Sequence, residues 1–122
     1  MDPLLLLLLL QIKHWIADFK IQTYAQTVRK GIYGDLIGLS HTMDHMYLTI
    51  LFLVLFNAFH PIGPLYITLA TILEGTAHYH IDWVKVHYGT KDITTPAFWC
   101  QFGLDQLAHQ CCYLLMALAL FM

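Results

Sequence analysis

Each of four long apolar segments carries a pair of acidic or histidine residues spaced by four, and this feature restricts the fold more than any other. The pairs are His14/Asp18, His41/His45, His78/Asp82 and Asp105/His109. Residues four apart on an α-helix lie on one face. Such groups inside an apolar helix are costly unless they face protein or a ligand. The pattern therefore predicts four helices whose polar faces meet in the interior of a bundle.

The composition indicates that the bundle lies in a lipid bilayer. The 122 residues are 58% hydrophobic and only 11% charged, whereas soluble domains carry about 25% charge. The expected helices cover residues 3–27, 35–59, 65–88 and 96–122, and about 20 residues suffice to cross the hydrocarbon core. The leucine run at 4–10 has no basic residue before it, so it is interpreted as part of a permanent helix rather than a signal peptide. We predict a single all-α domain over residues 1–122, a four-helix transmembrane bundle.

The basic residues of the connections predict the orientation of this bundle. Arg29 and Lys30 lie in the first connection and Lys91 in the third, whereas the second connection, 60–64, has no lysine or arginine. The positive-inside rule places the first and third connections in the cytoplasm. Both termini are then non-cytoplasmic, and all four polar stretches fall in one layer on the cytoplasmic side.

The pairs also repeat at a fixed distance along the chain. His41 follows His14 by 27 residues (41 − 14), and Asp105 follows His78 by the same 27 residues (105 − 78). The two halves are offset by 64 residues (78 − 14). An offset of two helices preserves the direction of each helix, so the repeat is parallel. We predict two helical hairpins, residues 1–60 and 65–122, related by a pseudo-twofold axis along the membrane normal.

The residue types in the layer are those of a metal centre. The predicted ligands are His14, Asp18, His41, His45, His78, Asp82, Asp105 and His109. Imidazole and carboxylate ligands favour zinc, with manganese or iron as alternatives, and eight donors could hold two ions. The alternative is a network of hydrogen bonds that only holds the helices together.

Two residues on the His78 helix face suggest catalysis. Glu74 lies one turn before His78 and is the candidate general base. Lys85 is the candidate anchor for a substrate anion, or else a partner for Asp82. Lys13 and Lys20 are expected to extend their ammonium groups towards the membrane surface. Together these residues favour a metal-dependent hydrolase of a lipid-linked or phosphoester substrate.

Other functional classes have different support. A net charge of −2 without a basic run gives a nucleic-acid partner no electrostatic basis. The three cysteines form no CxxC pair, and no GxSxG or Walker motif is present. Two further hypotheses stay open, a protein that binds or transports a metal ion or proton, and a structural subunit of a phage or membrane assembly. The chain could also form a homo-oligomer.

Three motifs carry a family resemblance over nearly the whole chain. They are His14-Trp-Ile-Ala-Asp18-Phe-Lys-Ile-Gln22-Thr23, then His78-x3-Asp82-x2-Lys85, then Asp105-Gln106-x2-His109. In this order they resemble the motifs of a family of small bacterial and phage membrane proteins known only as a domain of unknown function. The resemblance implies a polytopic protein of the bacterial inner membrane and brings no activity. A more distant likeness is to predicted membrane-bound metal-dependent hydrolases.

Overall fold

The computed structural model describes residues 2–120 and 122, and every regular element within these residues is a helix. The prediction of an all-α protein is confirmed. The elements are α1 (Pro3–Trp15), the π-helix η1 (Ile16–Lys20), α2 (Tyr24–Arg29), α3 (Leu36–Phe59), α4 (Gly63–Tyr88) and α5 (Pro96–Ala119). The last expected segment ran to residue 122, but α5 ends at Ala119, and residue 121 lies outside the described residues.

The first segment is not the continuous helix expected over residues 3–27, and that prediction was wrong. The chain widens into the π-turn η1, closed by a bond from Ile21 N to Ile16 O of 3.0 Å. It then leaves helical geometry and starts α2 with a capping box. Thr23 Oγ1 accepts from Gln26 N at 3.2 Å, and Gln26 Oε1 accepts from Thr23 N at 2.9 Å. This reciprocal cap satisfies the free amides of a new helix, so α2 forms as a separate element.

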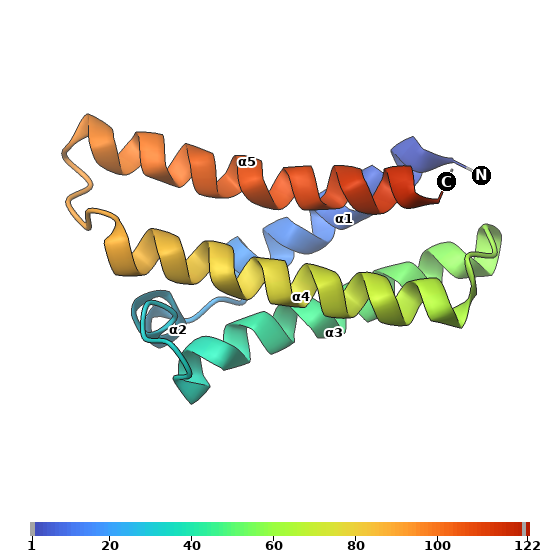
Figure 1. Ribbon diagram of the computed structural model, residues 1–122, viewed down its shortest axis with the longest axis horizontal. Helices are drawn as coiled ribbons and strands as arrows, with labels where there is room; N and C mark the ends of the chain where they lie inside the picture. The colour runs from blue at the N-terminus through green and yellow to red at the C-terminus, as the bar shows by residue number, and fades with distance from the viewer. Residues whose placement is uncertain (1, 121) are drawn as a thin grey trace.

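The four long helical segments form an antiparallel bundle (Figure 1). α4 packs between α3 and α5, and α1 packs against both α3 and α5, so the four helices close a ring. The two chain termini and the α3–α4 turn lie at one end, and α2 and the α4–α5 connection lie at the other. We call these the terminal end and the basic end of the bundle, the latter because Arg29 and Lys91 lie there.

Local sequence signals fix where the long helices begin. The Asp35 carboxylate accepts from the amides of Ile37 and Gly38 at the start of α3, and Thr95 caps α5 by accepting from Phe98 N. Such caps satisfy amides that have no partner within the helix. Proline lies in the first turn of α1, α4 and α5, where its missing N–H has no consequence.

A glycine allows α3 and α4 to approach closely beside the predicted ligands. A Cβ atom at Gly75 would lie 2.6 Å from the side chain of Met46, so a larger residue would require the Met46 side chain to move. Small residues at a helix crossing permit this kind of contact. The crossing holds His78 of α4 opposite His45 of α3, with the two rings 3.6 Å apart between their centroids.

The interior has two layers. Towards the terminal end, the core is a cluster of apolar side chains from all four long helices: Leu6, Leu10, Leu53, Phe56, Ala70, Tyr113, Met116 and Ala117. Towards the basic end, the buried side chains are mostly polar or charged. The fold thus separates an apolar half from a polar half along one bundle, as expected for the polar layer.

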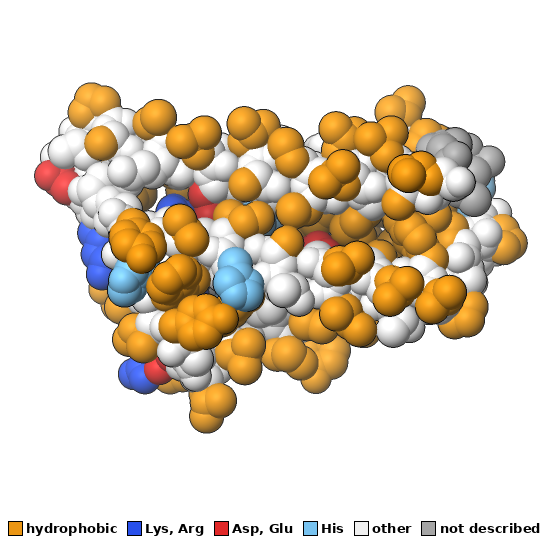
Figure 2. All heavy atoms as spheres, viewed as in Figure 1, with side chains coloured by type: hydrophobic (Ala, Val, Ile, Leu, Met, Phe, Trp, Pro, Cys, Tyr) orange, Lys and Arg blue, Asp and Glu red, His pale blue; other side chains and the backbone are white. Residues whose placement is uncertain are grey.

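The outer surface is largely apolar (Figure 2). Large apolar side chains are exposed along every long helix, for example Leu8, Leu51, Leu69 and Leu115. Among the described helices, α3 alone is long and apolar enough to cross a membrane by length and composition. The other long helices carry the interior charged groups described below.

A buried cluster of histidine and carboxylate groups

All eight residues predicted as ligands lie in the buried polar layer. Each is at most 8% exposed. His14 and Asp18 come from α1 and η1, His41 and His45 from α3, His78 and Asp82 from α4, and Asp105 and His109 from α5. The fold therefore brings the four pairs to one depth, but it does not bring all eight side chains to one point.

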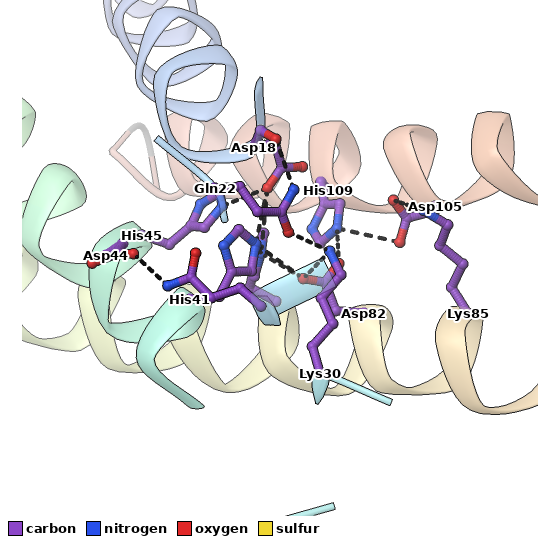
Figure 3. A network of polar contacts seen from close by, with 12 residues as sticks. Asp18, Gln22, Lys30, His41, Asp44, His45, Asp82, Lys85, Asp105 and His109 are labelled. Carbon is purple, nitrogen blue, oxygen red and sulfur yellow. Dashed lines mark hydrogen bonds and ion pairs between the residues drawn. The ribbon is translucent and has the colours of Figure 1, made fainter. Parts of the chain in front are cut away.

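The densest group forms around Asp18 (Figure 3). Asp18 Oδ1 lies 2.7 Å from His45 Nε2, 3.1 Å from His41 Nε2 and 3.9 Å from His78 Nε2. The Nε2 atoms of His41 and His78 face one another at 3.4 Å. In a tetrahedral zinc site with bonds of about 2.0–2.1 Å, neighbouring ligand atoms are separated by about 3.3 Å. These four residues could therefore hold a metal ion with little movement.

Asp18 reaches this group from the π-turn η1. A π-turn contains one residue more than an α-turn and changes the direction of the side chains that follow, and such turns occur often at functional sites. His14, one turn earlier, contacts the other oxygen, with His14 Nε2 3.0 Å from Asp18 Oδ2. Its Nδ1 lies 2.9 Å from the Tyr113 hydroxyl. His14 thus holds Asp18 in place from outside the group of four.

A second group lies on the α5 side. His109 Nε2 is 3.1 Å from Asp82 Oδ1, and His78 Nε2 is 3.1 Å from Asp82 Oδ2. His78, Asp82 and His109 also place three ligand atoms close enough to share a metal ion. Asp105 Oδ1 lies 3.5 Å from His109 Nε2 and is buried without a hydrogen-bond partner in the described part of the chain. Because both groups use His78, an ion in one would compete with the other for its nitrogen.

The spacings of the sequence repeat correspond to matched contacts. His45 bonds Asp18 and His109 bonds Asp82, and both pairs are 27 residues apart. Within the helices, His14 lies 3.0 Å from Asp18 and His78 lies 3.1 Å from Asp82. Superposition of residues 1–60 on residues 65–122 stays a prediction.

The surroundings of Glu74 and Lys13 differ from the sequence expectation. Glu74 Oε1 accepts from Lys13 Nζ at 2.9 Å, and Glu74 Oε2 accepts from Thr49 Oγ1 at 3.0 Å. Lys13 is fully buried, so the prediction that it extends to the membrane surface was wrong. The reason is that Lys13 lies on the inner face of α1, where a buried carboxylate compensates its charge.

Glu74 lies behind the histidine rings rather than at the point where their Nε2 atoms converge. Its Oε1 is 3.8 Å from His78 Nδ1 and 4.0 Å from His45 Nδ1. Neither Nδ1 atom has a hydrogen-bond partner within residues 2–120. Metal-binding histidines usually donate their second ring N–H to a carboxylate, which fixes the tautomer and ring orientation. The general-base role of Glu74 stays a prediction, and its position matches this orienting role better.

Sequence reasoning missed Lys30 as a member of the cluster. It was expected in the first connection, outside the helices, but its ammonium is buried, 3.1 Å from Asp82 Oδ2 and 3.0 Å from Gln22 Oε1. Lys30 follows α2 outside any long helix, so no periodic pattern could indicate its direction. Lys85 instead lies 3.8 Å from Asp105 Oδ2, so it does not form the pair with Asp82 that was one of its two expected roles.

The charges of the layer favour a bound cation. The carboxylates of Asp18, Glu74, Asp82 and Asp105 lie in one layer with the ammonium groups of Lys13, Lys30 and Lys85. With neutral histidines, four negative and three positive charges leave one negative charge in excess. A buried charge without compensation is strongly destabilising. A cation at the Asp18 group would offset this negative charge, and a divalent ion would leave one positive charge in excess.

Comparison with known proteins identifies one family. A model of the family described as "Protein of unknown function (DUF3307)" matches residues 4–122. No curated protein and no solved structure matches the chain.

Proposed function

We propose that this chain, which belongs to the DUF3307 family of proteins of unknown function, is an integral membrane protein that binds a divalent metal ion. The ligands are Asp18, His41, His45 and His78. The observation that carries the proposal is the buried convergence of three Nε2 atoms on one carboxylate oxygen, with two of these nitrogens 3.4 Å apart. Three imidazoles and one carboxylate suit zinc best, with manganese or iron as alternatives.

The arrangement of apolar and charged side chains supports the membrane part of the proposal. Apolar side chains cover the outside of the long helices, while the charged groups of α1, α4 and α5 are turned inward. The test by length and composition that selects α3 excludes α1, which has 13 residues, and the interior charges of α4 and α5 lower the hydropathy of those two helices. We propose four membrane spans in the bacterial inner membrane, with both termini non-cytoplasmic. Because Lys30 is buried, the orientation now depends on Arg29 and Lys91.

The two layers of the interior favour a site that is reached from one side. Among the described residues, the terminal half of the bundle interior holds the apolar cluster that contains Leu53 and Phe56, whereas the buried charged groups lie towards the basic end. This arrangement supports hydrolysis at a fixed centre over transport of a metal ion or proton across the membrane. A bound zinc ion would supply a Lewis acid. With four protein ligands it would need a fifth coordination position to activate a water. His14 and Gln106 contact Asp18, and Glu74 lies behind the His45 and His78 rings, 4.0 Å and 3.8 Å from their Nδ1 atoms.

Metal analysis of the purified chain tests the proposal. We expect about one zinc ion per chain after purification in mild detergent and dialysis, measured by inductively coupled plasma mass spectrometry. The variant His41→Ala/His45→Ala should lose the ion, while His87→Ala should keep it, because His87 lies outside the layer and bonds only the Gly31 carbonyl. If the wild-type chain binds no divalent ion at micromolar concentration and neutral pH, the polar layer is a structural network and the proposal is wrong.

A further inference from the structure

The seam between α4 and α5 contains two neighbouring hollows (Figure 2). The hollow towards the basic end has a volume of about 510 Å³, and the hollow towards the terminal end about 670 Å³. Ile81 and Ala108 line the first, and Ala77 and Cys112, one helical turn further along each helix, line the second. Ala108 and Ala77, which have small side chains, lie at the neighbouring edges of the first and second hollow.

The hollow at the basic end reaches the buried polar layer. Lys85 and Asp105 line it, and Asp105 Oδ1 is 3.5 Å from His109 Nε2. The Lys85 ammonium is 3.8 Å from Asp105 Oδ2, beyond hydrogen-bond distance, and its side chain is 21% exposed. Gln106 Nε2 donates to Asp105 Oδ2 at 3.1 Å and partly satisfies this carboxylate. Within the described residues Lys85 forms a long ion pair with Asp105 but no hydrogen bond, so its ammonium keeps N–H donors for an anion at the wall of the layer.

The hollow at the terminal end is suited to hydrocarbon. Its lining includes Leu65, Leu69, Leu73, Leu115 and Met116. The charged residue in its wall, Glu74, is already compensated by Lys13 and Thr49 inside the bundle. Pockets of several hundred Å³ with apolar walls and a few polar groups are typical of small-molecule sites.

The two hollows together match one amphiphile, with charge at the basic end and hydrocarbon at the other. We propose that the α4–α5 seam binds an anionic lipid, with its phosphate at Lys85 and one hydrocarbon chain in the apolar hollow. The lipid phosphate would then lie beside Asp105 and His109, at the edge of the proposed metal centre. This inference rests on the proposed function, because it names the substrate class of that centre, a lipid phosphoester entering from the side of the membrane.

Lipid binding to the full-length chain tests the inference. The probes are dioleoyl phosphatidic acid, dioleoylglycerol, which has the same chains without phosphate, and glycerol 3-phosphate, which has no chains. We expect native mass spectrometry of the delipidated protein to show at least tenfold tighter binding of phosphatidic acid than of either other probe. Equal binding of phosphatidic acid and dioleoylglycerol would overturn the inference. Binding of glycerol 3-phosphate as tight as that of phosphatidic acid would also overturn it.

Matched variants separate the two ends of the site. Lys85→Ala should remove the preference for phosphatidic acid, while Lys20→Ala, at another exposed lysine, should keep it. Leu69→Trp should fill the apolar hollow and weaken the binding of both lipids at least fivefold. Leu51→Trp, on the outer face of α3, should leave the binding of both lipids unchanged. Circular dichroism shows whether each variant is folded. An unchanged preference in folded Lys85→Ala would contradict the phosphate position.

A native thiol gives a second measurement that needs no substitution. Cys112 lines the apolar hollow, whereas the neighbouring Cys111 is exposed elsewhere on α5. Phosphatidic acid should slow alkylation of Cys112 by N-ethylmaleimide at least fivefold and leave Cys111 unchanged. Equal rates at Cys112 with and without lipid would overturn the position of the chain. A protein that binds phosphatidic acid in this way but holds no metal would support this inference and refute the metal centre alone.

Discussion

Replacement of Glu74 by glutamine should weaken metal binding even though Glu74 does not touch the metal position. One Glu74 oxygen faces His78 Nδ1 at 3.8 Å and His45 Nδ1 at 4.0 Å. Loss of such a carboxylate behind a ligand typically lowers metal affinity about 10- to 100-fold. Glutamine retains one acceptor oxygen, so we expect the metal dissociation constant of Glu74→Gln to be about tenfold larger. This corresponds to a loss of about 1.4 kcal/mol of binding free energy. Glu74→Ala has no acceptor oxygen for either ring, and its metal affinity should fall about 100-fold.

The same substitution should also destabilise the fold, for a separate reason. Lys13 is fully buried and is 2.9 Å from the Glu74 carboxylate. Removal of one partner from a buried pair costs about 3–5 kcal/mol, because the other charge is left without compensation. The double variant Lys13→Met/Glu74→Gln removes both charges. It should therefore recover most of the stability while its metal affinity stays low.

Two assays on the same samples separate these effects. Cobalt absorption titration with a competing chelator measures the affinity, and metal-free thermal unfolding measures the stability. If the double variant regains wild-type metal affinity together with stability, Glu74 acts only through the fold. If Glu74→Gln binds cobalt within twofold of the wild type, the orienting role is wrong. In that case the general-base role remains testable by activity.

Three further predictions concern topology, the ligands and the start of α3. With the native cysteines replaced, Ile32→Cys and Pro61→Cys should react with a membrane-impermeant maleimide from opposite sides, and reaction from one side only would refute the four spans. Asp82→Ala should weaken metal binding and lower the thermal midpoint, while His87→Ala should change neither. The Arg29 guanidinium and the Gly38 amide hold the pKa of Asp35 below its usual value. Its contribution to α3 is therefore complete at neutral pH and is lost only as pH falls through the lowered folded pKa, which amide hydrogen exchange at Gly38 can follow.

The ends of the last three long helices followed closely from the sequence. Residues 35–59, 65–88 and 96–122 were expected, and α3, α4 and α5 span Leu36–Phe59, Gly63–Tyr88 and Pro96–Ala119. Prolines, caps and polar turns mark these ends with local chemistry. The π-turn at Ile16–Lys20 itself carries no such mark, because it contains no proline or glycine and has no side-chain cap. The capping pair Thr23 and Gln26 was the sequence signal that could have predicted the start of a new helix after the π-turn.

The candidate site was predictable only as far as helical periodicity extends. The spacing of four placed each pair on one face, and the equal separations of 27 correspond to the contacts of His45 with Asp18 and of His109 with Asp82. Periodicity cannot say which of eight side chains converge, because this depends on how the helices rotate against one another. It also gives no direction to Lys30, which lies in a turn, and it cannot show that Lys13 pairs with Glu74 from another helix.

The pairing of Lys13 with Glu74 has a consequence for how the proposed membrane bundle would be inserted during synthesis. On insertion scales, Lys13 and Asp18 together oppose entry of their helix by about 5–7 kcal/mol, while seven leucines favour it by about 2–4 kcal/mol. The first helix is therefore a poor substrate for insertion alone. Its compensating groups on α3 and α4 leave the ribosome later. Stable insertion of the first helix must wait for the second hairpin, so a chain truncated before Glu74 should be retained by the insertion machinery or degraded.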